Sequence, residues 1–243
     1  MICTIQHNSK KHQIDLSKPI NISIPMRMSK KNVIAWYQKA PTFKKILSVK
    51  KKDAVNFNSI YFNPHAHGTH TECVGHITKE FYSINTYLKQ FFFFAEVVTV
   101  APEKQGGDFV ISKKQLQFLL GNKKRQALVI RTIPNIGEKL SKKYSHTNPP
   151  YLLEEAAVYL KEKGIEHLLI DLPSIDKEKD DGKLLAHNAF WNTNGSIRYN
   201  ATITELIFVP NSVEDGTYFL NIQIAPFEND ASPSKPVLYQ IAD

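Results

Sequence analysis

The stretch YLLEEAAVYLKEKGIEHLLIDL, residues 151–172, indicates the fold class by its order of polar, apolar and glycine residues. A helix is predicted to start near Pro149 and Pro150 and to end at Gly164, because proline suits the first helical turn and glycine the position just after the last. The run HLLIDL, residues 167–172, follows and is apolar enough for a buried strand. The stretch therefore predicts a helix, a glycine stop and a strand in succession.

The same succession occurs earlier in the chain. Ser112 is a favourable N-cap for the segment KKQLQFLL, Gly121 ends that helix, and the apolar run ALVIRT follows at residues 127–132. Helix and strand in alternation indicate an α/β protein whose inner strands are covered on both faces. The β-rich runs outside these units suggest hairpins or meanders, and they are NISIP (21–25), SIYFN (59–63), FFFFAEVVTV (91–100), TELIFVP (204–210) and YFLNIQIAPF (218–227).

Length and composition favour one globular domain over residues 1–243, with mixed β-sheets and helices packed outside them. The net charge of +8 comes from lysine clusters scattered along the chain, so a solvated surface is favoured over nucleic-acid binding. The apolar run at residues 91–100 contains Glu96 and is too short to span a bilayer, which predicts no membrane role. Two cysteines, Cys3 and Cys73, and an N-terminus without a long apolar core favour a reduced, cytoplasmic protein.

A second stretch, NPHAHGTHTECVGH at residues 63–76, contains four of the nine histidines. Imidazole and carboxylate groups are the ligands that ions such as zinc and manganese prefer. In an extended segment His70 and Glu72 point to the same side, and Gly68 permits a tight turn that brings a preceding histidine round to them. The spacing does not match a helical zinc-protease motif, and a zinc finger needs more cysteines. The segment therefore predicts a metal site.

The segment GTHTECVGH resembles the H-x-G-T-H-x-D-x-P-x-H signature of the metal-dependent cyclase-like hydrolases, the family of bacterial kynurenine formamidase and isatin hydrolase. Three further stretches resemble that family in the same order: IDLSKPINISIP (14–25), IDLPSIDKEKDDGKLLAHNAFW (170–191) and TITELIFVPN (202–211). The resemblance covers most of the chain. It implies a cyclase-like fold of the swivelling β/β/α type, a divalent metal cofactor of one or two Zn or Mn ions, and a homodimer or homotetramer.

The resemblance also implies roles for individual residues. His76 matches the catalytic acid/base of the family. The first histidine of the signature falls on Ala66, and we expect His65 to take its place through a one-residue bulge, with His67 in contact with a ligand or the substrate. The reverse assignment of the two histidines stays open. The residues that match metal ligands of the family are His70, Glu72, His187 and Glu205.

Four further side chains are candidates for the surroundings of the metal. Asp171 and Asp176 are expected to orient ligand histidines through hydrogen bonds, although capping a strand end is an equally good explanation. Trp36 and Trp191 are candidates for the apolar walls of a substrate site, although each is also a good core residue.

The activity that the resemblance implies is hydrolysis of a small aryl formamide, such as N-formylkynurenine, or of a cyclic amide. Water activated by the metal would attack the amide carbonyl, and His76 would carry a proton to the leaving nitrogen. Two alternatives remain: a metal-dependent lyase or cyclase acting on a small molecule, and a catalytically silent protein that binds metal or a small molecule. Glu72 and Val74, where the family signature has aspartate and proline, indicate a divergent subgroup.

Overall fold

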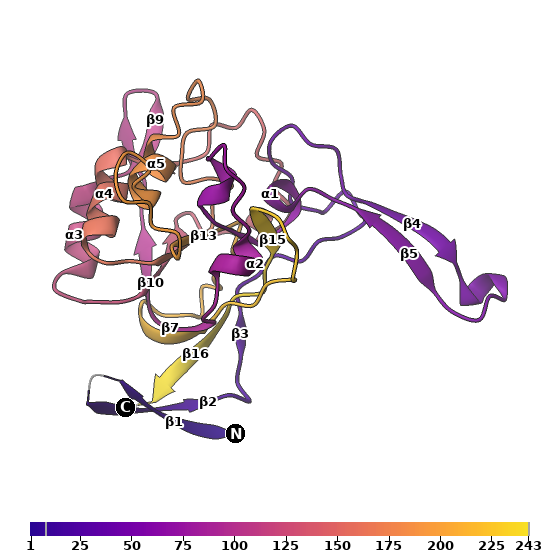
Figure 1. Cartoon of the computed structure of the whole chain (residues 1–243), viewed down its shortest axis with the longest axis horizontal. Helices are drawn as coiled ribbons and strands as arrows, with labels where there is room; N and C mark the ends of the chain where they lie inside the picture. Colours follow the sequence, from indigo (N-terminus) through magenta and orange to yellow (C-terminus); the bar gives the residue numbers. More distant parts are fainter. Residues whose placement is uncertain (8, 243) are drawn as a thin grey trace.

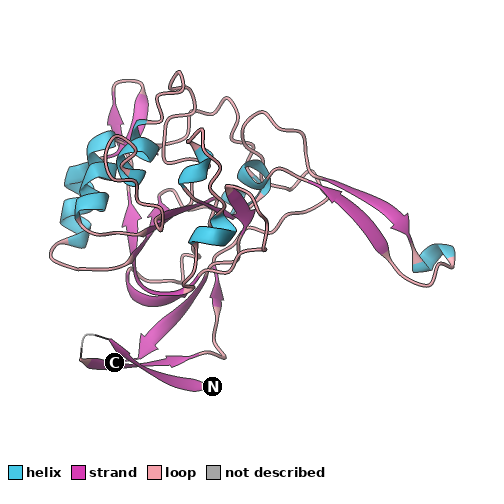
Figure 2. Ribbon diagram, viewed as in Figure 1, coloured by secondary structure: helices cyan, strands magenta, loops and turns pink. Residues whose placement is uncertain are grey.

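The structure, a computed structural model, describes residues 1–7 and 9–242 of the chain. Among these residues one large mixed sheet forms the framework (Figure 1; Figure 2). Across this sheet the strands run in the order β1 (Ile2–His7), β2 (Lys10–Asp15), β16 (Val237–Ala242), β14 (Gly216–Asn221), β7 (Phe92–Val100), β10 (Ala127–Thr132), β12 (His167–Ile170), β13 (Thr202–Glu205), β6 (His70–Glu72) and β15 (Ala231–Pro233), and β3 (Ile20–Asn21) pairs with β16.

The middle of the sheet is parallel and buried on both faces. Strands β7, β10, β12 and β13 pair in parallel, whereas β14 on one side and β6 on the other are antiparallel. Leu128 and Ile130 of β10 pack towards the helices, and the alternate residues Ala127 and Val129 pack into a second apolar cluster on the opposite face. Because both faces are covered, the strand is continuously apolar rather than alternating, as the sequence predicts.

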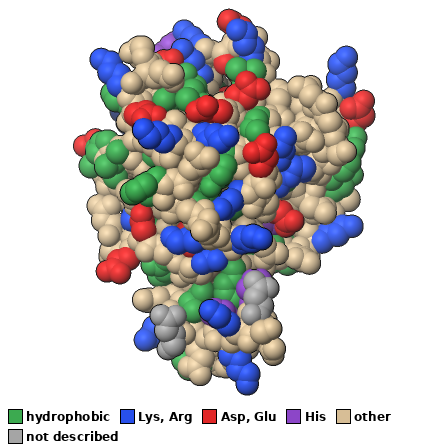
Figure 3. All heavy atoms as spheres, turned by 90° about the vertical axis from the view of Figure 1, so that its left-hand side faces the viewer, with side chains coloured by type: hydrophobic (Ala, Val, Ile, Leu, Met, Phe, Trp, Pro, Cys, Tyr) green, Lys and Arg blue, Asp and Glu red, His purple; other side chains and the backbone are tan. Residues whose placement is uncertain are grey.

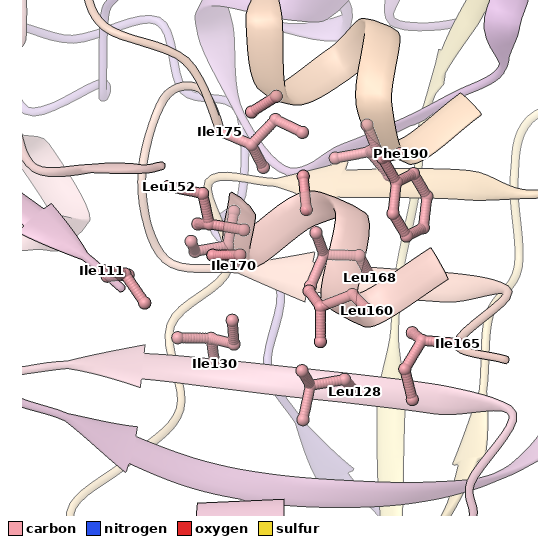
Figure 4. Packing of buried hydrophobic residues seen from close by; sticks show 14 of the residues in the cluster. Ile111, Leu128, Ile130, Leu152, Leu160, Ile165, Leu168, Ile170, Ile175 and Phe190 are labelled. Carbon is pink, nitrogen blue, oxygen red and sulfur yellow. The ribbon is translucent and has the colours of Figure 1, made fainter. Parts of the chain in front are cut away.

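Three helices cover one face of the sheet: α3 (Lys113–Leu120), α4 (Glu154–Glu162) and α5 (Leu185–Trp191). Leu160 of α4 and Phe190 of α5 are fully buried there against Leu128 and Leu168 of the sheet (Figure 4). Shorter helical segments are α1 (Pro64–His67), α2 (Ile84–Tyr87), η1 (Val49–Lys51), η2 (Val74–His76) and η3 (Gly137–Ser141). The expectation of mixed sheets with helices outside them is therefore confirmed.

The two predicted helices are present, with one difference at a start. Helix α3 begins after Ser112, whose side chain accepts a hydrogen bond from the Gln115 backbone in a capping box, and it ends at Gly121 as predicted. Helix α4 begins later than expected, because Tyr151–Leu152 form strand β11 instead. That strand belongs to a small sheet with β9 (Asp108–Ile111) and β8 (Glu103–Gln105).

A hairpin of β4 (Thr42–Leu47) and β5 (Phe57–Tyr61) projects far from the body of the protein (Figure 1). The run SIYFN, predicted as a strand, therefore lies largely in this arm rather than in the core. Apolar side chains on the arm are exposed, and they are Ile46, Leu47, Val49, Val55, Phe57, Ile60 and Tyr61. A two-stranded hairpin without a hydrophobic partner is only marginally stable in water, so this arm is an unusual feature.

The surface over the helical face carries charges of both signs. Lysine and arginine side chains are interspersed there with aspartate and glutamate (Figure 3). None of the described helices combines the length and the apolar character that crossing a membrane requires.

Candidate metal centre

The middle of the candidate site is strand β6, which lies between β13 and β15. The antiparallel register puts His70 opposite Glu205 and Glu72 opposite Ala231. Because His70 and Glu72 are two residues apart on one strand, their side chains share a face. His70 Nε2 lies 3.9 Å from Glu72 Oε2 and 3.5 Å from Glu205 Oε2, and all three side chains are buried. The sheet register thus brings together three of the residues expected to bind metal.

His65 reaches the same place from the short helix α1. The Asn63 side chain caps this helix by accepting a hydrogen bond from the His65 backbone N–H at 2.9 Å, and Pro64 occupies its first turn. His65 Nδ1 lies 3.0 Å from Glu72 Oε2. The segment before Gly68 is therefore one helical turn, which corrects the expectation of an extended chain with a bulge.

His67 points away from the carboxylates. Its Nδ1 accepts a hydrogen bond from the Asn63 backbone N–H at 2.9 Å, and its Nε2 donates to the Lys39 carbonyl at 2.8 Å. Both ring nitrogens are thus engaged by the backbone. Ala66, where the signature has a histidine, is fully buried between the two. Of the histidines that flank Ala66, the structure places His65 beside the carboxylates.

Gly68 and Gly75 fit the close packing around β6. The φ angle of Gly68 is 173°, which is ordinary extended backbone, so a tight turn is not the reason for this glycine. A Cβ at position 68 would lie 3.1 Å from the Ile24 carbonyl oxygen, and one at position 75 would clash with the backbone of Tyr82. Close approach of neighbouring segments therefore requires glycine at position 75 and leaves little room for a side chain at position 68.

His187 enters the site from the first turn of α5. Asp176 accepts hydrogen bonds from the backbone N–H groups of Ala186 and His187, at 2.7 and 3.1 Å, and from His187 Nδ1 at 2.6 Å. The ring is thereby turned so that Nε2 lies 3.2 Å from Glu72 Oε1 and 3.7 Å from Glu205 Oε1. Asp176 makes the orienting contact that the sequence suggested, and it also caps the helix.

His76 lies on the solvent side of the site. Its Nε2 is 3.9 Å from Glu72 Oε2, and its ring stacks on that of His65 with the centroids 4.2 Å apart. The His76 side chain is 32% exposed, whereas the Glu72 side chain is fully buried. A molecule approaching from solvent therefore meets His76 before it meets the inner residues.

Asp230 is a member of the site that sequence reasoning missed. Its Oδ2 lies 2.8 Å from His65 Nε2 and 3.3 Å from His76 Nδ1. The stretch around it, APFENDASP, contains no feature that separates this aspartate from a loop residue. Its proximity depends on the pairing of β15 with β6, which connects parts of the chain that are far apart in sequence.

The four histidines share one arrangement that fits a divalent cation. In each ring one nitrogen lies beside an oxygen that anchors it, and the other nitrogen faces Glu72 or Glu205. The anchoring oxygens belong to Asp230 for His65 and His76, to the Gly68 carbonyl at 3.1 Å for His70, and to Asp176 for His187. Five buried side-chain atoms of the described residues have no well-directed hydrogen bond, and two of them, His70 Nε2 and Glu72 Oε2, lie here; the nearest contact of Glu72 Oε2 is the ion pair with His65 Nδ1. Such orphaned groups are costly unless something binds them, and imidazole nitrogens with carboxylate oxygens suit Zn²⁺ and Mn²⁺.

The ligand atoms form two groups that share one carboxylate. The first group is His65, Glu72 and His76, the second is His70, Glu72 and Glu205, and within each group the ligand atoms lie within 4.8 Å of one another. The donors are thus numerous enough to hold one ion or two.

Electrostatics in the cluster favour cations. Burial opposes a charge on His187, yet hydrogen bonds to two carboxylates outweigh burial and raise the pKa of His187 to about 10. The pKa of His65 is raised to about 10 for the same reason. Burial opposes a charge on Glu72 as well, but the nearby histidines, first of all His76, hold its pKa well below the usual range. Protons on imidazole therefore balance the carboxylates, and a divalent cation would replace those protons on binding.

Asp171 binds residues other than a histidine. Its carboxylate accepts hydrogen bonds from the Thr132 backbone N–H at 2.9 Å and from the Lys139 ammonium at 2.7 Å. The aspartate thus joins the end of β12 to neighbouring β10 and to the buried lysine. This contact corrects the expectation that Asp171 orients a histidine.

The two tryptophans also take structural positions. Trp191 is fully buried, and its Nε1 donates a hydrogen bond to the Ala201 carbonyl at 2.9 Å. Its ring packs behind His187, with the centroids 5.4 Å apart, so it supports the histidine from the core side. Trp36 is partly buried and packs with Tyr144 and Leu206 in a separate apolar cluster. The substrate-wall assignment is corrected for Trp191, which has no exposed surface.

Comparisons with known proteins agree with this architecture. Residues 14–177 match the family described as Putative cyclase. Among curated protein sequences, none matches the chain.

Solved structures with the same fold are distant in sequence. A potential metal-dependent hydrolase with cyclase activity has a TM-score of 0.67 at 18% identity, over 91% of this chain and 97% of that one. A predicted metal-dependent hydrolase from Bacillus stearothermophilus has a TM-score of 0.67 at 19% identity, over 91% and 98% of the two chains. Isatin hydrolase A from Labrenzia aggregata, bound to benzyl benzoate, has a TM-score of 0.68 at 14% identity, over 91% and 93%. At such identities the likeness shows the fold, and the family match over two thirds of the sequence shows that the chain belongs to the putative cyclase family.

Proposed function

We propose that this chain is a metal-dependent hydrolase of a small aryl formamide or cyclic amide, with N-formylkynurenine as the first substrate to test. The observation that carries the proposal is the convergence of four anchored histidines on two buried carboxylates, with two polar atoms left without partners. Membership of the putative cyclase family supports the same reaction class. The isatin hydrolases of similar fold support an amide of a small aromatic compound.

Five residues would hold the metal: His65, His70, Glu72, His187 and Glu205. One or two Zn²⁺ or Mn²⁺ ions suit these donors, and a bound ion would supply a Lewis acid that activates water and polarises the amide carbonyl. Asp176 fixes His187 so that Nε2 stays directed into the site.

His76 is proposed to move the proton. Its Nε2 faces the site, and its ring is the most exposed of the four histidines at the centre. From this position it can take a proton at Nε2 from the attacking water and release it to the leaving nitrogen, while Nδ1 remains beside Asp230.

Metal analysis of the purified protein, followed by assays with N-formylkynurenine and isatin, tests the proposal. We expect about one or two equivalents of Zn or Mn and a product heavier than the substrate by one water for isatin, or formate release for the formamide. A product formed without uptake of water would favour a lyase or cyclase instead. Bound metal without turnover of any aryl formamide or cyclic amide would favour a silent binding protein.

We also propose that residues 1–243 form one domain and that two copies of the chain associate. Strands β1 and β2 from the N-terminal part pair with β16 from the C-terminal part, so one sheet includes both ends of the described chain. The exposed apolar side chains of the β4–β5 arm need a covering surface, and a second copy can supply it.

The free cysteines Cys3 and Cys73 suit the cytoplasm, where we place the protein.

A further inference from the structure

The backbone holds Asp230 beside the metal centre independently of its side chain. Ala231, the next residue, lies opposite Glu72 in the pairing of β15 with β6. The Asp230 carbonyl accepts a hydrogen bond from the Cys73 backbone N–H at 3.0 Å, and the carbonyl of Asn229 accepts one from Ile84 at 2.8 Å. Three backbone contacts therefore hold the loop that carries the Asp230 carboxylate. Because none of them involves the Asp230 side chain, we expect them to persist when that side chain is replaced.

One oxygen of Asp230 meets two histidines through chemically different nitrogens. Oδ2 lies 2.8 Å from Nε2 of His65 and 3.3 Å from Nδ1 of His76. A carboxylate only accepts hydrogen bonds, so each of these nitrogens carries a proton when it bonds to Asp230. In a neutral imidazole the other nitrogen then has a free lone pair, and these are His65 Nδ1 and His76 Nε2, the two atoms that face Glu72.

We infer that Asp230 is a positioning residue that fixes His65 and His76 in opposite tautomers, so that both present a lone pair to the metal centre. The inference rests on the proposed function, because the lone pairs matter only where a cation binds.

With a cation bound beside Glu72, the stacking of the two rings favours this tautomer pair over a doubly charged one. His65 and His76 lie with their centroids 4.2 Å apart and their planes 26° apart. Two imidazolium rings at that separation would repel each other, and a cation bound beside Glu72 would repel both. Neutral imidazoles are then the favoured forms, and Asp230 selects which nitrogen of each ring faces the cation.

The test uses Asp230→Ala and Asp230→Asn, with Glu228→Gln as the matched control. Glu228 is on the same loop, but its carboxylate accepts a hydrogen bond from Asn85 at 2.5 Å rather than from a histidine. Zinc affinity is measured by competition with a chelator. We expect affinity to fall about 10–100-fold in Asp230→Ala and less in Asp230→Asn, whose amide oxygen can still accept one hydrogen bond, and to stay unchanged in the control.

A second measurement separates positioning from a purely structural effect. Long-range ¹H–¹⁵N spectra of the zinc-loaded protein report which ring nitrogen of each histidine carries a proton. We expect His65 protonated at Nε2 and His76 at Nδ1 in the wild type, and loss of this pattern in Asp230→Ala; should that variant not fold, Asp230→Asn provides the comparison. Wild-type protein that takes up no zinc would overturn the proposed function. Zinc uptake with unchanged affinity and tautomers in the variants would overturn only the role of Asp230.

Discussion

His70 lies directly opposite Glu205 in the antiparallel pairing of β6 with β13, and the tip of its ring comes within 3.5 Å of the carboxylate. Antiparallel pairing places directly opposite side chains on the same face, so the register of two strands determines this contact. A shift of one residue would turn His70 and Glu72 to the other face. The metal centre therefore depends on the sheet as much as on the histidine-rich segment.

Removing one of the buried partners on β6 should abolish stable metal binding. His70→Ala removes the buried Nε2 that has no hydrogen-bond partner in the protein. Glu72→Gln replaces the carboxylate that both ligand groups share with a neutral amide. We expect each variant to retain less than about one tenth of the wild-type metal after dialysis, given the 10–100-fold cost of even indirect changes. Elemental analysis measures this, with Glu228→Gln as the control. Full metal content in both variants would show that the ion binds elsewhere.

The neighbours of Ala66 offer a matched pair of variants. His65→Ala should lose metal, because His65 Nδ1 lies 3.0 Å from Glu72, whereas His67→Ala should keep it, because both nitrogens of His67 bond to the backbone. Metal titration of the two proteins, with circular dichroism to check folding, makes the comparison. The opposite result would assign the missing signature histidine to position 67.

The β4–β5 arm should hold two copies of the chain together. Replacing Phe57 and Ile60 by serine removes exposed apolar surface from the arm without touching the core, since the two side chains are 58% and 50% exposed. We expect the mass in solution, measured by light scattering at micromolar concentration, to fall from about that of two chains to that of one. Lys50→Ser, at the tip of the arm, serves as the control. A wild-type monomer at these concentrations would contradict the proposed association.

The sequence predicts the interior of this fold better than its edges. Residues 92–100, 127–132 and 167–170 are recognisable as strands because burial on both faces requires continuous apolar residues. Helix α3 is recognisable by its cap and its terminal glycine. In contrast, α5 follows an N-cap residue in the left-handed region, Leu184 at φ 46°, and its first turn is capped by Asp176, ten residues before Ala186. Local signals cannot reveal a cap supplied by another segment.

The same distinction holds within the metal centre. His70 and Glu72 could be paired from the sequence, because alternation along a strand is a local rule. The turn that carries His65 was expected as a bulge, since a single helical turn has too few residues to show a period. Asp230 could not be found at all, because its approach depends on the register of β15 against β6. Long-range pairing, which a single sequence does not display, completes the site.

Acid should destabilise the protein partly through His167, which lies outside the metal centre. Burial, together with the charge of Arg198, lowers the pKa of His167 to about 3. In the unfolded chain the pKa is about 6.5, so between pH 6.5 and pH 3 the unfolded state binds a proton that the folded state does not. The stability that His167 contributes is therefore fully present above pH 6.5 and declines as the pH falls towards 3.

His167→Gln tests this linkage, because glutamine does not titrate and can still bond to Thr202, which lies 2.9 Å from the histidine ring in the wild type. We expect the free energy of unfolding, from urea denaturation between pH 4 and pH 7, to depend less on pH in the variant. Equal slopes for the two proteins would mean that His167 can be protonated without unfolding.

His76 should be required for turnover but not for metal binding. Its Nε2 is 3.9 Å from Glu72 and its ring is partly exposed, whereas the inner ligand candidates His70 and His187 are buried. His76→Ala should therefore keep its metal and its fold and lose about 10²–10⁴-fold in kcat, the usual contribution of a general acid or base. Elemental analysis and the formamide assay on the same preparation measure both quantities. Loss of metal together with activity would make His76 the third ligand of the group that contains His65 and Glu72, and the proton would then need another carrier.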